Sequence, residues 1–224
     1  MKAAVHAVYA LVLLSIAMVP ALADVLYSNG PINGTIGGFN IYGGQSVSDS
    51  FVLSSAAIVT GVDFGAWTDD AAAGLVASVQ WSIGTTPGGS IYSGTAATTD
   101  TLVTHDLNFY TIDSDSFFIP NVSLGAGTYY LTLQNTTTSD GTGVAYWDIN
   151  NGPSAAYANG STSLVGYAGI YTTWSESFDI QGATSGVTPE PGYLALLIAG
   201  IVGIIWLKRR RVRAESLRIA GFSK

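Results

Sequence analysis

The sequence contains no cysteine, and this absence excludes several kinds of scaffold and site. A disulfide framework, a cysteine nucleophile and a thiolate metal site all need the missing thiol. Residues 24–188, between two hydrophobic ends, are as long as an ordinary single domain and can bury a core without cross-links. The lack of cysteine therefore does not argue against export.

Positive charge is also missing from residues 24–188, which contain thirteen Asp and Glu residues but no Lys or Arg. A domain without cations cannot neutralise phosphates, so we do not expect nucleic-acid binding. It also lacks the Arg and Lys clamps that hold nucleotides and carboxylate substrates. Divalent cations are the partners that such an acidic surface attracts.

The first 23 residues have the pattern of a signal peptide. A positively charged start leads into an apolar run over residues 8–19. Ala21 and Ala23 then give the small-x-small pattern that signal peptidase recognises, which predicts cleavage before Asp24. An uncleaved N-terminal anchor is the less favoured alternative, because the apolar run is short for a membrane span.

A proline-containing motif and an apolar segment mark the other end. Pro189, Glu190 and Pro191 precede residues 192–207, which are apolar except for one tyrosine hydroxyl and one indole. As a helix this segment is about 24 Å long, and flanking Tyr, Trp and Lys side chains can cover the difference from a hydrocarbon core of about 30 Å. The sequence predicts one transmembrane helix over residues 192–207, joined to the domain by a linker over residues 183–188.

A basic cluster follows the apolar segment and sets its orientation. The cluster consists of Lys208, Arg209, Arg210 and Arg211. Positive residues beside a membrane helix stay in the cytoplasm, which predicts that residues 212–224 form a cytoplasmic basic tail and that the acidic domain lies outside. The signal peptide predicts the same topology independently.

This order of features resembles the PEP-CTERM sorting signal, the tail read by exosortases in exopolysaccharide-producing Gram-negative bacteria. Residues 189–191 match its motif, residues 192–207 its membrane span and residues 208–211 its basic end. The resemblance implies export across the inner membrane, anchoring by the tail and processing near the motif by an exosortase-like enzyme. It also implies a mature protein at the cell surface or in the extracellular matrix.

Residues 24–182 predict an all-β domain. Gly, Ser, Thr, Asn and Asp interrupt the chain every several residues, and short β-branched and aromatic runs lie between them. The best strand candidates are residues 50–53, 57–64, 75–83, 89–93, 101–111, 116–119, 128–134, 143–148, 163–167 and 177–181. About ten such strands predict an antiparallel β-sandwich, jelly-roll-like by preference.

Several motifs in the domain resemble those of the β-sandwich ectodomains that commonly precede such tails. These motifs are residues 47–51, 62–67, 79–83, 124–133, 146–148 and 177–180. The likeness spans most of the domain and implies its fold, but it implies no known activity.

The domain offers little for catalysis, and we do not expect an enzyme. His105 is its only histidine and no Gly-x-Ser-x-Gly elbow is present, so we expect His105 at the surface or at a strand edge. Aspartate pairs such as Asp69 and Asp70 would have to face each other across a cleft to act as a glycosidase, which adjacent positions do not show.

Two pairs of residues are candidate calcium ligands, both expected on loops. Asp113 and Asp115 form one pair, and Asp148 and Asn150 form the other. Neither has the spacing of an EF-hand, and simple turn chemistry is the favoured alternative. No other cofactor is expected.

Aromatic residues provide the main binding hypothesis, because Tyr and Trp combine an apolar face with a hydrogen-bonding tip that suits sugars. Tyr146, Trp147, Tyr171 and Trp174 lie near predicted turns and are the expected glycan contacts, whereas Trp81 is expected in the core. The sequence favours a structural or adhesive protein of a biofilm or exopolysaccharide matrix. A carbohydrate-binding module, with calcium as a candidate cofactor, is the alternative, and a surface hydrolase is less favoured.

Overall fold

The computed structural model describes residues 23–34, 37–69, 75–105, 110–160, 162–163 and 174–185, with Gly200, Ile201 and Ile204. One compact unit ends at Ser185 and a second begins at Gly186, where the three described residues are helical. Among the residues described, no helix is long and apolar enough to cross a membrane. The Pro-Glu-Pro motif, the basic cluster and the predicted signal peptide, apart from Ala23, lie outside these ranges.

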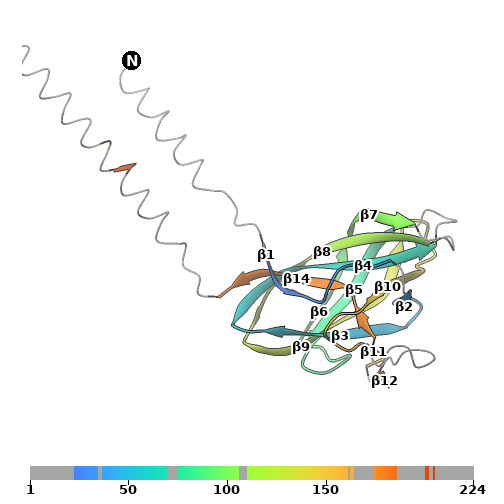
Figure 1. Cartoon of the computed structure of the whole chain (residues 1–224), viewed down its shortest axis with the longest axis horizontal. Coiled ribbons are helices and arrows are strands. Elements are labelled where there is room, and N and C mark those ends of the chain that lie inside the picture. Colours follow the sequence, from blue (N-terminus) through green and yellow to red (C-terminus); the bar gives the residue numbers. More distant parts are fainter. Residues whose placement is uncertain are drawn as a thin grey trace, which may run out of the picture. The chain divides into compact units, whose positions relative to one another are not determined.

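The first unit consists of two antiparallel β-sheets (Figure 1). The large sheet contains β1 (Asp24–Ser28), β2 (Gly38–Asn40), β4 (Ala57–Asp69), β7 (Thr99–His105), β8 (Tyr110–Leu124), β10 (Ala145–Asn150), β13 (Ser175–Glu176) and β14 (Phe178–Thr184). The small sheet contains β3 (Ser46–Leu53), β5 (Val76–Gly84), β6 (Tyr92–Ala97), β9 (Gly127–Thr138), β11 (Tyr157–Ala158) and β12 (Thr162–Ser163). The all-β class predicted from the sequence is confirmed.

The long strand β4 organises the large sheet. It pairs with β8 on one side, and with β14 and then β10 on the other. β7 extends the sheet beyond β8, and β1 extends it beyond β14. The first and last strands of the unit are therefore neighbours, with Asp24 opposite Gly182 (Figure 1).

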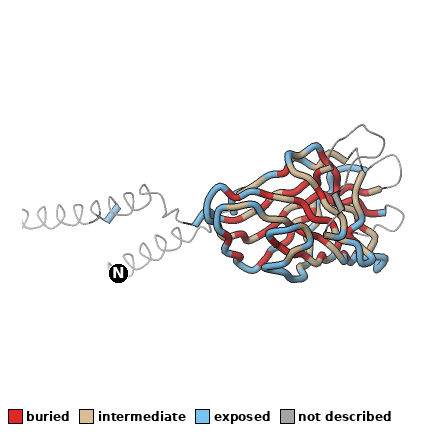
Figure 2. Tube along the Cα trace, turned by 90° about the horizontal axis from the view of Figure 1, so that it is seen from below, coloured by how far each residue is buried: buried red, intermediate tan, exposed pale blue. Residues whose placement is uncertain are grey.

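Side chains alternate in direction along each strand, which gives each sheet an inner and an outer face. Phe64 and Ala66 of β4 point into the core, where they join Leu131, Leu133 and Trp81 of the small sheet. Figure 2 shows these buried stretches, in red, running through the interior of the unit. Burial of Trp81, which is 4% exposed, agrees with the prediction.

The observed strands differ from the predicted ones mainly at the edges of the sheets. The predicted run 101–111 is divided between β7 and β8, and β1, β2, β11 and β13 were not predicted. These short strands have few buried apolar residues, so the periodic signal is weak there. β14 continues to Thr184, and the backbone N–H of Ser185 donates to the carbonyl of Ala56 at 2.7 Å, so the sheet includes residues predicted as linker.

Candidate functional site

An open pocket lined by aromatic residues lies where β4, β8 and β10 run side by side. Trp67, Tyr110 and Tyr146 line it from these strands, together with Gly37 and Gly38. Its volume is about 210 Å³, smaller than the roughly 300–1,000 Å³ of pockets that enclose a drug-sized ligand. The pocket therefore suits one ring of a ligand whose remainder stays in solvent.

The sheet register brings the three rings together on the outer face of the large sheet. Trp67 is directly opposite Tyr146, and Tyr110 lies diagonally across from Trp67 on β8. Ala66 and Trp147, the neighbours of Trp67 and Tyr146, belong to the core. Since successive residues of a strand point to opposite faces, Trp67 and Tyr146 point outward.

The rings support one another through edge and tilted contacts. Tyr110 meets Tyr146 at a centroid distance of 5.8 Å and 87°, and Trp67 meets Tyr110 at 5.8 Å and 59°. Tyr42 packs on Tyr146 from another side at 5.7 Å. Burial, then the hydroxyls of Tyr42 and Tyr110, raise the pKa of Tyr146. The Tyr146 hydroxyl therefore keeps its proton at neutral pH and can act as donor or acceptor.

A buried aspartate fixes the Trp67 ring that lines the pocket. The indole Nε1 of Trp67 donates to Asp148 Oδ1 at 2.6 Å. The backbone N–H groups of Asn33 and Gly34 donate to the same carboxylate at 3.1 and 3.3 Å. Burial raises the pKa of Asp148, and these hydrogen bonds oppose the shift. Asp148 thus fastens both the Trp67 ring and the segment before β2.

Two glycines permit the close approaches that form this region. A Cβ on Gly38 would lie 2.7 Å from Tyr146 Cβ and 2.8 Å from the Trp147 carbonyl oxygen. A Cβ on Gly65, on the outer face of β4, would lie 2.7 Å from Asp148 Cβ. A side chain at either position would force Tyr146 or Asp148 to move, so the pocket requires glycine there.

Of the predicted glycan contacts, Tyr146 lies in the pocket, but the prediction for Trp147 is wrong. Trp147 is 0% exposed, and its ring contacts Phe64 and Phe178 at 6.4 and 5.5 Å. Its proximity to a predicted turn suggested exposure. The alternation of β10 instead points Trp147 inward and its neighbour Tyr146 outward.

The other two predicted contacts add nothing to the pocket. Trp174 is half-buried and packs edge-on against Phe39 at 5.8 Å. Tyr171 lies outside the described residues.

Trp67 and Tyr110 were missed as candidate contacts. One local signal could have identified Trp67, because Asp69 and Asp70 follow it as a turn signal of the kind used to select the other aromatics. Tyr110 becomes part of the pocket only through the pairing of β8 with β4.

The candidate calcium ligands lie on strands, so the prediction that they lie on loops is wrong. Asp148 and Asn150 belong to β10, and their side-chain oxygens accept hydrogen bonds from protein donors, including Gly152 N to Asn150 Oδ1 at 2.8 Å. Asp113 and Asp115 belong to β8, and none of their carboxyl oxygens has a hydrogen-bond partner. Within the described part of the chain, no three acidic or histidine side chains group as a metal site.

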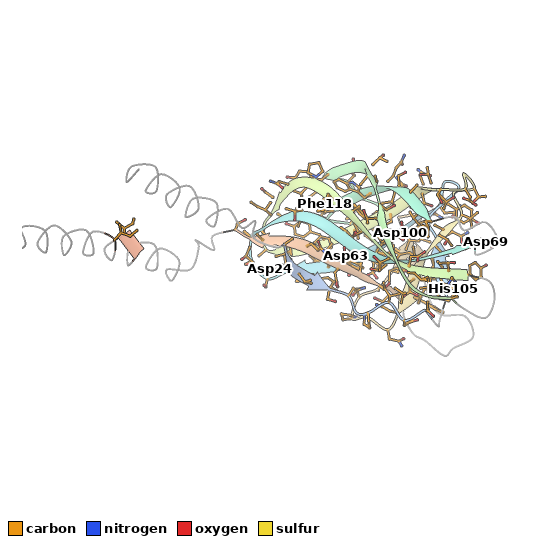
Figure 3. All side chains as sticks on the ribbon, turned by 90° about the horizontal axis from the view of Figure 1, so that it is seen from above. Asp24, Asp63, Asp69, Asp100, His105 and Phe118 are labelled. Atoms are coloured by element: carbon orange, nitrogen blue, oxygen red, sulfur yellow. The ribbon has the colours of Figure 1, made fainter. Side chains whose placement is uncertain are left out.

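Neither His105 nor Asp69 is among the described residues that line the pocket, although Asp69 lies directly opposite Tyr110, and Asp70 lies outside the described residues. His105 is exposed at the end of β7 (Figure 3), as expected for a histidine at a strand edge. None of the described residues that line the pocket is acidic. The described part of the pocket lining thus offers aromatic faces and a hydroxyl, and it contributes neither of the two carboxyls that glycoside hydrolysis uses.

Comparison with known proteins does not connect this pocket to a family. No protein-family model matches the chain, and no curated protein is significantly similar to it.

Proposed function

We propose that this chain is an exported surface protein whose β-sandwich, jelly-roll-like in type, attaches to polysaccharide through the pocket of Trp67, Tyr110 and Tyr146. The pocket is the observation that supports this function best. Aromatic faces pack on the C–H faces of a sugar ring, while tyrosine hydroxyls bond its hydroxyl groups. The opening to solvent allows a long polymer to pass, with one ring held at a time. The protein then acts as an adhesin or a structural component of an exopolysaccharide matrix.

Charge narrows the class of polysaccharide. Residues 24–188 carry thirteen acidic and no basic side chains, apart from His105. A polymer of uronic acids would meet a surface of its own sign and would be repelled. We therefore expect the ligand to be a neutral polysaccharide.

Affinity electrophoresis of the full-length protein in detergent tests this function. Wild type is expected to migrate more slowly in gels that contain a neutral exopolysaccharide than in gels that contain a polyuronate. Tyr146→Ala removes the ring that contacts Tyr42 and Tyr110, and we expect about tenfold weaker binding, equal to about 1.4 kcal/mol.

Phe118→Ala is the matched control, because Phe118 is an aromatic residue of the same sheet, is 86% exposed and is not in the pocket lining (Figure 3). It should migrate as wild type does. Equal retardation of wild type and Tyr146→Ala would contradict the proposed site.

The proposal includes a route to the cell surface. Signal peptidase cuts before Asp24, and an exosortase-like enzyme processes the tail near Pro189, Glu190 and Pro191 while residues 192–207 hold the chain in the membrane. Two observations support this route. β1 begins at Asp24, so no part of the sheet would be lost by the first cut, and the first compact unit ends at Ser185, just before the motif.

Mass spectrometry of the protein from its native host tests the route. We expect an N-terminus at Asp24 and a C-terminus near residues 189–191. A Glu190→Ala variant, which alters only the motif, should accumulate in the membrane with its tail attached. Mature wild-type protein that retains residues 192–224 would refute tail processing.

A further inference from the structure

Two aspartates on the inner face of β8 have buried carboxyl groups without a hydrogen-bond partner. Asp113 and Asp115 are 1% and 0% exposed, and their four carboxyl oxygens are buried without a hydrogen-bond partner. They lie on the same face as Phe117, which belongs to the core. Across the sheet, Ala66 and Phe64 of β4 are their direct neighbours.

The edge strand β7 borders this pair on the other side. Asp100 lies directly opposite Asp115, and Leu102 lies opposite Asp113. Asp100, labelled in Figure 3, is half-buried. His105 lies at the end of the same strand, β7.

Two other buried carboxylates, Asp49 and Asp148, have the donors that this pair lacks. Asp49 accepts hydrogen bonds from Asn29 Nδ2 at 3.1 Å and from the backbone N–H of Glu176 at 2.7 Å. Asp148 accepts one from Trp67. Hydrogen bonds of this kind offset the cost of removing a carboxylate from water. The Glu176 carboxyl is also unpaired, but its acidic neighbours Asp49 and Asp148 are already bonded.

Residues 24–188 contain no Lys or Arg that could neutralise the pair. Asp113 and Asp115 point to the same face of β8, and Asp100 lies directly opposite Asp115. Negative charges this close and this deeply buried repel one another at a large energetic penalty. A divalent cation removes that penalty, because it gives both carboxylates an opposite charge.

We propose that Asp113 and Asp115 bind one calcium ion beneath the edge strand β7, with Asp100 at its entrance. Both carboxyl groups are buried, have no hydrogen-bond partner and lie two residues apart on one face of the strand. Carboxylate oxygens suit a hard cation, and calcium accepts six to eight oxygens in irregular geometry, whereas magnesium requires a near-ideal octahedron. Because no three acidic or histidine side chains of the described residues form a complete set, water and backbone carbonyl oxygens supply the remaining ligands.

The site lies on the strand that carries Tyr110 into the pocket. Asp113 and Asp115 face inward on β8, while Tyr110, near the start of the same strand, lines the pocket. Calcium therefore holds β8 and the edge strand β7 in register beside the pocket without contacting the ligand. It acts as a structural ion and not as a bridge to sugar.

Calcium titration of the full-length protein in detergent at pH 7.5 tests the site. Calorimetry should find one calcium ion per chain. The melting temperature should rise by about 5 °C or more between EGTA and calcium at 100 times its Kd. Magnesium at the same concentration should give a smaller rise. Absence of both the binding heat and the rise would overturn the proposal.

Asp115→Asn separates loss of the site from failure to fold. We expect this variant to lose the calcium-dependent rise and to melt higher than wild type in EGTA, because a buried charge is gone. Asp179→Asn is the control, since Asp179 and Asp63 form another acidic pair across β14 and β4. It should keep the full rise. A rise that persists in the double variant Asp113→Asn, Asp115→Asn would put the ion elsewhere and overturn the proposal.

Discussion

Replacing Trp147 with alanine is expected to lower the free energy of unfolding by about 3–5 kcal/mol. The side chain is 0% exposed and packs between the rings of Phe64 and Phe178. Its indole N–H donates to the carbonyl of Ser177 at 2.9 Å. The substitution would leave both a cavity in the core and a buried carbonyl without its donor.

The neighbouring residue provides the matched comparison. Tyr146→Ala removes a ring of similar size from the outer face of the same strand, so we expect a smaller loss of stability together with loss of polysaccharide binding. Trp147→Phe should fall between wild type and Trp147→Ala, because it keeps most of the volume but not the donor. Urea unfolding followed by circular dichroism measures all three. A loss below about 1 kcal/mol for Trp147→Ala would be inconsistent with a core position.

The protein should become more stable as the pH is lowered from about 7.5 to about 4.5 in metal-free buffer. Burial raises the pKa of Asp49 to about 6, although four hydrogen bonds oppose the shift. Burial, then the charges of Asp49 and Asp148, raise the pKa of Glu176 well above its usual range. Folding is therefore coupled to proton uptake by these carboxyls.

The direction of this pH dependence follows from the higher pKa of these carboxyls in the folded state. Each of these carboxyls stabilises the folded state fully at a pH below its pKa in the unfolded chain, which is about 4. This stabilisation is lost as the pH rises through the pKa of the carboxyl in the folded state. For Asp49 the shift corresponds to about 3 kcal/mol, lost between about pH 4 and pH 6, at about 1.4 kcal/mol per pKa unit. Glu176 extends the loss to higher pH. Most proteins lose stability on acidification, so a gain in stability at lower pH would be diagnostic of these buried carboxyls.

Urea unfolding between pH 4 and pH 8 measures this dependence. Glu176→Gln should raise stability at pH 7.5 and reduce the slope, because the variant cannot ionise. Asp24→Asn, which removes an exposed carboxyl on β1, is the control for the loss of one negative charge. Stability that increases from pH 4.5 to pH 7.5 would contradict the prediction.

The β class could be predicted because its signal is local. Leu131 and Leu133 alternate with polar residues in the sequence, and both point into the core. The pocket could not be predicted in the same way. Trp67, Tyr110 and Tyr146 are far apart in the chain and meet through the pairing of β4 with two other strands. A bulge between Val59 and Gly61 also changes the register that sets which face Trp67 occupies.

The buried carboxyls were misplaced for a different reason. Aspartate is common in turns and uncommon inside sheets, so Asp113, Asp115 and Asp148 were expected on loops. Each instead lies on a strand and is at most 1% exposed. Residue preference therefore predicts the wrong location for a carboxyl that the fold buries inside a sheet.

The pairing of β14 determines how the domain carries a mechanical load. β14 lies between β1 and β4, and its last residue, Thr184, is opposite Ala57 at the start of β4. The pocket is near the other end, at Trp67, about 33 Å away along the strand. If the pocket holds a sugar, as proposed, tension between that sugar and the chain leaving β14 acts along the strands. The hydrogen bonds that join β14 to β1 and to β4 are perpendicular to the strands. They are therefore loaded together in shear and do not open one by one.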